Sequence, residues 1–163
     1  MKQKKQYDII VIGSGPAGES AAMNAAKKGR RVAVVSDRDK VGGNCTHLGT
    51  IPSKALRQSV KQVMQFSSNP LLREFATLRK PCFQDIMRHA ARVIDEQVHL
   101  RSAYYEKNGI DIVQGVASFV DQHTVRLGSR GPLLTADHFI IATGSRPYRP
   151  DSVDFTHPRI FDS

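Results

Sequence analysis

The order of apolar and polar residues first predicts a strand, a helix and a second strand. Residues 9–12 are all apolar, as is typical of a strand buried on both faces. Residues 19–28 are rich in alanine, a strong helix former, and Gly29 follows at a position suited to a helix C-terminus. Residues 32–35 are again all apolar and indicate a second buried strand. Residues 7–36 therefore predict a βαβ unit, in which the crossover helix joins two parallel strands.

Two longer stretches carry apolar residues at helical spacing. The first begins near Pro52, a residue suited to the first turn of a helix, and ends at Asn69-Pro70. The second covers residues 83–107, where a single apolar stripe indicates one long helix, and Asn108-Gly109 ends it. Such a stripe is explained by packing against a core, so it carries no functional signal of its own.

From residue 110 onwards the pattern changes to short strand candidates. They are separated by turn-forming residues and cover 110–114, 117–120, 124–127 and 139–142. The whole pattern predicts an α/β fold. We expect a Rossmann-like domain that contains a parallel sheet with crossover helices. A long helical segment and a small antiparallel meander are added to this sheet.

Composition and charge narrow the class of protein. The 163 residues are 40% hydrophobic and 24% charged, which is ordinary for a soluble domain with one core. The longest apolar runs are far shorter than the ~20 residues of a membrane span. The net charge of +9 comes from scattered lysines and arginines, so it indicates a solvated surface and attraction of phosphorylated small ligands rather than nucleic-acid binding. Cys45 and Cys82 form no disulfide framework, and we expect a cytoplasmic protein without a metal site.

A glycine-rich turn directly follows the first predicted strand. It reads Gly13, Ser14, Gly15, Pro16, Ala17 and Gly18, and so matches the G-x-G-x-x-G pattern. In such turns the first glycine allows the tight bend, the second lets a diphosphate approach the backbone, and the third lets helix and strand pack closely. The helix N-terminus then offers free N–H groups and a partial positive charge to the phosphates. The sequence therefore predicts a dinucleotide site at this turn.

The same pattern includes an acidic residue that holds a ribose hydroxyl at the end of the second strand, about 20 residues further on. Asp37 lies 19 residues beyond Gly18, whereas Ser36 stands one position earlier, where the predicted strand ends. Either residue could face the ribose, and a surface role for Asp37 stays open.

Residues 41–56, which read VGGNCTHLGTIPSKAL, carry the most informative motif. The segment resembles the flavoprotein disulfide reductase family, whose members carry a G-G-x-C-x-x-x-x-C-x-P-x-K motif with a redox disulfide against the flavin. Cys45 matches the first cysteine of that motif, but Thr50 occupies the position of the second and cannot form a disulfide. Within the family the segment is most similar to the soluble pyridine nucleotide transhydrogenases, which carry this same change.

The resemblance implies FAD as cofactor and NAD(P)H as substrate of the complete enzyme. Without the second thiol, the expected reaction is hydride transfer between NADPH and NAD⁺ through the flavin. Lys54 is the expected catalytic residue, because by resemblance its charge lies beside the flavin and stabilises the reduced ring. Two alternatives stay open. The first is a dihydrolipoamide-dehydrogenase-like enzyme that has lost its disulfide, and the second is a non-catalytic FAD-binding module.

The resemblance extends to further cofactor-binding positions. Residues 115–119 resemble the turn whose backbone contacts the adenine, and residues 142–147 resemble the second FAD signature of the family. Family members usually place a glutamate at the position of Ser36, which leaves Asp37 as the expected ribose partner. Beyond the glycine turn, the implied cofactor-binding residues are Ser36, Asp37, Gly43, Asn44, Cys45, Lys54, Ala117, Ala142, Thr143 and Gly144.

Residues 1–163 are expected to form the FAD-binding domain alone. In the family, NAD(P)-binding and dimerisation domains would follow, so we expect this stretch by itself to be inactive. The resemblance implies a full-length homo-oligomer that binds small-molecule nucleotides and neither nucleic acid nor a membrane.

Overall fold

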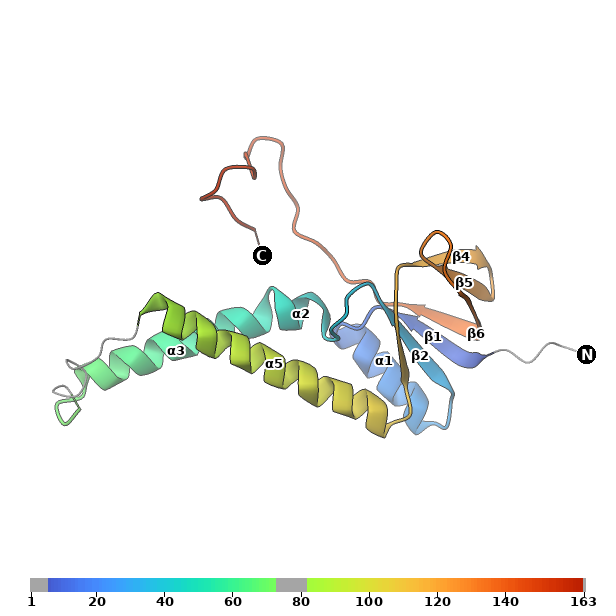
Figure 1. Cartoon of the computed structure of the whole chain (residues 1–163), viewed down its shortest axis with the longest axis horizontal. Helices are drawn as coiled ribbons and strands as arrows, with labels where there is room; N and C mark the ends of the chain where they lie inside the picture. The colour runs from blue at the N-terminus through green and yellow to red at the C-terminus, as the bar shows by residue number, and fades with distance from the viewer. Residues whose placement is uncertain (1–5, 73–81, 163) are drawn as a thin grey trace, which may run out of the picture.

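The computed structural model describes residues 6–72 and 82–162 (Figure 1), so residues 1–5, 73–81 and 163 of the expected domain lie outside the described range. Within that range six strands form one sheet in the order β3-β2-β1-β6-β5-β4. The strands are β1 (Tyr7–Ile12), β2 (Val32–Ser36), β3 (Asp111–Gln114), β4 (Ala117–Asp121), β5 (Thr124–Leu127) and β6 (Leu133–Ile141). The helices are α1 (Pro16–Lys27), α2 (Gly43–His47), α3 (Thr50–Ser68) and α5 (Phe83–Lys107).

The predicted βαβ unit is confirmed. β1 pairs in parallel with β2, with Ile10 opposite Ala33, and α1 connects the two strands. α1 begins at Pro16, earlier than the alanine-rich pattern indicates, because the fixed φ of proline suits the first helical position. Gly29 follows the helix with φ +73°, a left-handed conformation that favours glycine.

The sheet is parallel around β1 and antiparallel at one edge. β3 joins the parallel part beside β2, while β4, β5 and β6 form the predicted antiparallel meander. β6 belongs to both parts, because residues 133–135 pair with β5 and residues 136–141 pair in parallel with β1. The predicted strand at 139–142 is therefore too short. Polar residues at 135, 137 and 138 interrupt the apolar run that would mark a buried strand.

Both faces of the central strands are buried, because successive side chains of a strand point to opposite faces. One core lies against α1 and the C-terminal end of α5, and it contains Val11, Ala22, Ala25, Val32, Val34, Val41, Tyr105 and Ile110. The other lies against the meander, and it contains Ile10, Ala33, Val35, Val125, Leu127, Leu134 and Ala136. The predicted α/β fold is confirmed.

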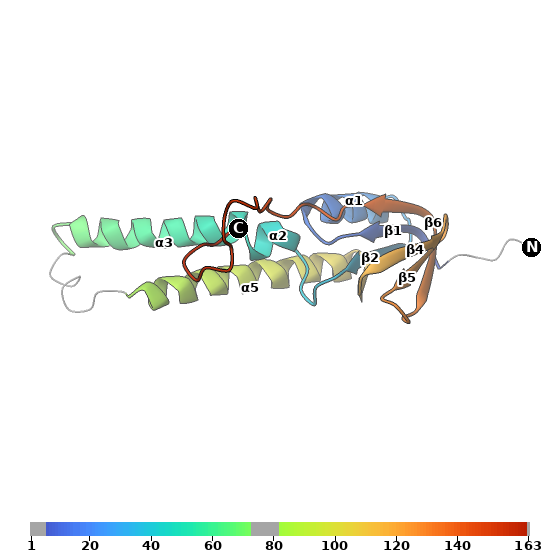
Figure 2. The ribbon, with the colours of Figure 1, turned by 90° about the horizontal axis from the view of Figure 1, so that it is seen from above.

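Two antiparallel helices, α3 and α5, pack along each other and extend away from the sheet (Figures 1 and 2). α5 coincides with the helix predicted over 83–107, and Cys82 occupies its N-cap position. Near the other end of α5, Arg101 forms an ion pair with Glu19 of α1. Tyr105 is fully buried there, and burial raises the pKa of its hydroxyl. These contacts attach the long helix to the sheet.

After β6 the chain leaves the sheet, and residues 142–162 contain neither helix nor strand (Figure 1). This segment begins at the same end of the sheet as the loops after β1 and β2. None of the described helices combines the length and the hydropathy that are needed to span a bilayer.

Candidate functional site

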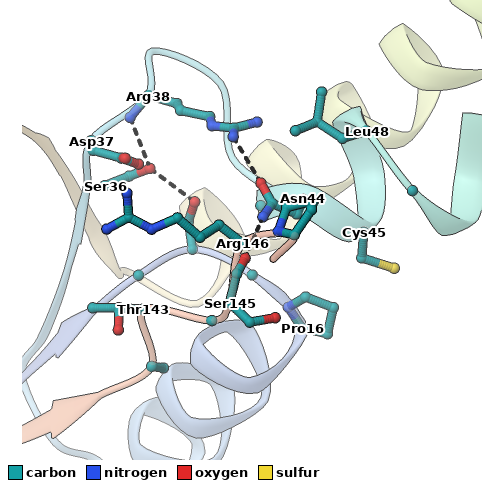
Figure 3. Close-up of a pocket in the computed structure, with 18 residues that line it drawn as sticks. Pro16, Ser36, Asp37, Arg38, Asn44, Cys45, Leu48, Thr143, Ser145 and Arg146 are labelled. Atoms are coloured by element: carbon teal, nitrogen blue, oxygen red, sulfur yellow. Dashed lines mark hydrogen bonds between the residues drawn. The ribbon is translucent and has the colours of Figure 1, made fainter. Parts of the chain in front are cut away.

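A cleft opens at the edge of the sheet where the parallel strands β1, β2 and β6 end. In open α/β sheets, ligands bind outside the carboxyl ends of the strands. The cleft has a volume of about 850 Å³ and is lined by residues 13–16, 36–38, 43–45, 48–49 and 142–147 (Figure 3). Each lining segment therefore lies at the end of one of these three strands or belongs to the loop and helices after β2.

The three glycines of the dinucleotide turn have different surroundings. A Cβ atom at Gly13 would lie 2.2 Å from the carbonyl oxygen of Ala142, and one at Gly18 would lie 1.9 Å from the oxygen of Gly13. The packing of the protein itself therefore requires glycine at both positions. At Gly15 a Cβ atom would meet only the Cα atom of Gly43, at 3.9 Å, and the φ of −72° suits any residue. The fold thus leaves room at Gly15, which lines the cleft.

The N-terminus of α1 has no side-chain cap. Gly15 is the N-cap residue and Pro16 has no N–H, so the first helical hydrogen bond runs from the Glu19 N–H to the Gly15 oxygen at 2.8 Å. The N–H groups of Ala17 and Gly18 have no acceptor within the helix. Together with the helix dipole, these donors favour an anion at this end of the cleft.

Ser36 and Asp37 occupy different places at the end of β2. The Ser36 hydroxyl is buried and shares a hydrogen bond of 2.9 Å with the Ser14 hydroxyl, while the Ser36 carbonyl accepts from the Gly115 N–H at 2.8 Å. Asp37 is exposed, and it is the only carboxylate among the described residues that line the cleft. Ser36 is therefore engaged within the protein, whereas Asp37 is available to a ligand. This geometry favours Asp37 as the ribose partner, which stays a prediction.

The segment after β2 packs directly against the glycine turn. The Gly42 N–H donates to the Ser14 oxygen at 3.0 Å, and a Cβ atom at Gly43 would lie 2.7 Å from the Cα atom of Gly15. This close approach places the start of α2, with Gly43, Asn44 and Cys45, in the wall of the cleft.

Asn44 connects this segment to two others. Its amide nitrogen donates to the Ser145 carbonyl oxygen at 2.7 Å, and its amide oxygen accepts from the Arg38 guanidinium at 2.7 Å (Figure 3). The loop after β2, helix α2 and the turn after β6 are therefore joined across the cleft by one side chain.

The residues expected to carry redox chemistry lie around the junction of α2 and α3. Cys45 lines the cleft, and both Cys45 and Cys82 are free thiols. Thr50, at the position of the second cysteine, is the first residue of α3. Lys54 follows one turn later, and it is exposed and outside the lining of the cleft. Its place beside a flavin stays a prediction.

The turn after β6 forms the wall opposite α2. The Ala142 N–H donates to the Ile12 oxygen at 2.8 Å, which holds the turn against the end of β1. Ala142, Thr143 and Gly144 line the cleft. Ala117, the first residue of β4, does not.

The structure brings most of the predicted site residues together. Twelve of them line the cleft, namely Gly13, Ser14, Gly15, Pro16, Ser36, Asp37, Gly43, Asn44, Cys45, Ala142, Thr143 and Gly144. Ala17 and Gly18 lie in the first turn of α1 without lining it, and Lys54 and Ala117 also lie outside the lining.

The sequence analysis missed six lining residues, which are Arg38, Leu48, Gly49, Ser145, Arg146 and Pro147. Five of them stand inside the motif segments 41–56 and 142–147, which would have identified them. Arg38 stands outside both, and its one signal is a cation directly after the predicted ribose residue. With Arg146 it gives the cleft two cations against the single carboxylate of Asp37, a balance that suits an anionic ligand.

The fold is that of a known class of protein. The sequence profile of the pyridine nucleotide-disulphide oxidoreductases matches residues 7–161, and the chain belongs to that family. The glycine turn, the segment 41–56 and the turn after β6 all fall within the matched residues.

Individual relatives narrow the comparison. Over 160 residues the chain is 60% identical to the soluble pyridine nucleotide transhydrogenase of Azotobacter vinelandii and 56% identical to that of Pseudomonas putida. Each alignment covers 96% of this chain and 34% of the relative, so the chain spans about a third of their length. The resemblance predicted from residues 41–56 is confirmed.

A solved structure supports the fold independently. The HOCl-induced flavoprotein disulfide reductase RclA from Escherichia coli is similar with a TM-score of 0.72 and 24% sequence identity. The match covers 89% of this chain and 30% of that chain.

Proposed function

We propose that the cleft binds FAD and that residues 1–163 form the FAD-binding domain of a soluble pyridine nucleotide transhydrogenase. The complete enzyme would transfer hydride between NADPH and NAD⁺. Family membership and 60% identity to a transhydrogenase support this assignment.

The residues present fit FAD. The room at Gly15 admits a diphosphate next to the backbone, and the N–H groups of Ala17 and Gly18 can donate to its oxygens. The Asp37 carboxylate can accept a hydrogen bond from a ribose hydroxyl at the end of β2. The volume of about 850 Å³ lies within the range of roughly 300–1,000 Å³ that is usual for ligand sites.

FAD, when bound, supplies the group that accepts and returns hydride, and the protein binds, orients and tunes it. Lys54 carries a positive charge on a flexible stem from the second turn of α3, a helix whose N-cap residue Gly49 lines the cleft. A cation there would stabilise the negative charge that the cofactor gains on reduction.

The observation that carries the transhydrogenase assignment is the lone thiol in the cleft. A redox disulfide needs two cysteines whose Cα atoms lie roughly 4.4–6.8 Å apart. Cys45 has Thr50 at the partner position, and Cys82 is free and stands outside the cleft lining. The cleft therefore offers no pair of thiols that could accept electrons, and in this proposal a second nicotinamide nucleotide accepts the hydride.

The test compares two acceptors in the full-length protein. We expect FAD to be retained, NADPH to reduce thio-NAD⁺, and lipoamide to be reduced poorly or not at all. Cys45→Ser should keep FAD and most of the transhydrogenase activity, with Cys82→Ser as the matched control outside the cleft. Lipoamide reduction that is lost in Cys45→Ser would contradict the assignment, as would loss of hydride transfer in a Cys45→Ser protein that still holds FAD.

We also propose that the full-length protein is a cytoplasmic homo-oligomer. Two free cysteines suit a reducing compartment. Large apolar side chains are exposed along the paired helices α3 and α5, and exposed apolar patches mark interfaces. They are Val60, Met64, Phe66, Phe83, Met87 and Leu100. Light scattering on the full-length protein as it elutes from a size-exclusion column measures its mass. The mass of a monomer would contradict the proposed oligomer.

A further inference from the structure

Arg38 is fixed across the cleft before any ligand arrives. Its Nη2 atom donates to Asn44 Oδ1 at 2.7 Å, and Asn44 Nδ2 donates in turn to the Ser145 carbonyl oxygen at 2.7 Å (Figure 3). The backbone N–H of Arg38 lies 3.4 Å from the Ser36 hydroxyl oxygen. The residue therefore reaches from the end of β2 to helix α2, and its head group is held in one place.

The charge of Arg38 is not neutralised by a carboxylate. Its partner is the neutral amide of Asn44, and no described residue forms an ion pair with it. Arg149, by contrast, is paired with Asp162 at 2.6 Å, and this pair raises the pKa of the arginine. Because a guanidinium carries several N–H donors in a planar fork, Arg38 keeps donors for a further partner.

The head group of Arg38 is linked to the glycine turn through Asn44 and Gly43. Asn44, which holds it, directly follows Gly43, and a Cβ atom at Gly43 would lie 2.7 Å from the Cα atom of Gly15. Gly15 is the position at which the fold leaves room for a ligand. The cleft therefore contains a fixed cation without a carboxylate partner, and the uncapped start of α1 lines the same cleft.

We propose that Arg38 is an anion-binding residue of this cleft, which contacts phosphate oxygens of the adenosine diphosphate half of a bound dinucleotide, and that Asn44 positions it. The inference rests on the proposed FAD site and adds a charged side chain to the backbone donors of the glycine turn. Arginine matches phosphate with two parallel hydrogen bonds, and hydrogen bonds to charged groups are about twice as strong as neutral ones.

The experiment measures binding of FAD, ADP and adenosine to the full-length apoprotein. ADP and adenosine are measured by competition with FAD, whose fluorescence changes on binding. Arg38→Gln should weaken FAD and ADP by about tenfold and leave adenosine unchanged, because only the first two carry phosphates. Arg38→Lys keeps the charge and should restore part of the loss. Arg126→Gln removes the same charge from an exposed position on β5 outside the cleft and should change none of the three affinities.

A second variant tests positioning. Asn44→Ala should lower the ratio of ADP to adenosine affinity, and it should lower that ratio less, or not at all, when Arg38→Gln is already present. The melting temperature of each apoprotein shows whether it is folded.

The outcomes separate the two proposals. If the wild-type protein binds neither FAD nor ADP, both the proposed function and this inference are wrong. If it binds both, and Arg38→Gln weakens ADP no more than adenosine, the FAD site stands and the role of Arg38 is overturned. Equal loss of the ratio from Asn44→Ala with and without Arg38 would refute the positioning role.

Discussion

Gly15→Ala should separate ligand binding from folding. The nearest atom to a Cβ at this position is 3.9 Å away, and the backbone angles of φ −72° and ψ 179° are open to alanine. Replacing glycine by alanine at a compatible position stabilises a protein by ~0.4–1 kcal/mol through the unfolded chain. Alanine is also a poorer N-cap, at a cost of roughly 0.5–1 kcal/mol. The two effects oppose each other, so the melting temperature should change by no more than ~2–4 °C.

Binding should respond far more strongly to the same methyl group. The methyl group of the new alanine would stand where a diphosphate approaches the N–H groups of Ala17 and Gly18. A hydrogen bond to a charged group is worth roughly 1.5–3 kcal/mol. Losing two would cost about 3 kcal/mol or more, which corresponds to FAD binding weakened by roughly 100-fold or more.

The assay pairs two measurements, the thermal melt of the apoprotein and the FAD dissociation constant from fluorescence. Gly18→Ala is the matched control, because its Cβ would lie 1.9 Å from the Gly13 oxygen and the overlap must disturb the fold. Overpacking of this kind costs about 1–3 kcal/mol, so this variant should melt earlier. A Gly15→Ala protein that binds FAD as tightly as the wild type, or that melts as early as Gly18→Ala, would refute the reasoning.

Asp37→Ala should weaken FAD retention more than Ser36→Ala, because the Ser36 hydroxyl is engaged within the protein; equal retention in the two variants would count against Asp37. Lys54→Ala should lower the turnover of the full-length enzyme by about tenfold or more while FAD stays bound, and unchanged turnover would remove Lys54 from the mechanism. The Asp8 carboxylate accepts from the Arg31 guanidinium and N–H, which lowers the pKa of Asp8 below its ordinary value of 3.8. This stabilisation is complete above that value and is lost as the pH falls through the lower folded pKa. The Asp8→Asn protein should therefore have a lower free energy of unfolding than the wild type at neutral pH, and this free energy should fall less steeply in acid. The same slope with pH in both proteins would contradict this.

The regular elements of the fold could be predicted because a local pattern encodes them. The helix over 83–107 carries one uninterrupted apolar stripe and is followed by Asn108-Gly109. β1 and β2 contain continuous apolar runs, over residues 9–12 and 32–35, because both faces of these strands are buried. β6 changes partner halfway, from antiparallel β5 to parallel β1, and its polar residues hide its true start.

The candidate site could be predicted where its residues belong to a turn motif, and not where they depend on contacts between distant segments. The glycine turn can be recognised from the G-x-G-x-x-G spacing of its glycines. Arg38 looks in the sequence like one more scattered cation. Its place is set by Asn44, which is itself held by Ser145, 101 residues further along the chain. No local pattern encodes such a contact.

The position of β6 has a consequence for how the chain is made. β1 lies between β2 and β6, and Ala142 closes against Gly13, so one wall of the cleft is synthesised long after the other. On the ribosome the N-terminal βαβ unit emerges first. One edge of its β1 is then bare, and such an edge can pair with other chains. The complete lining of the cleft therefore exists only after residues 142–147 have emerged.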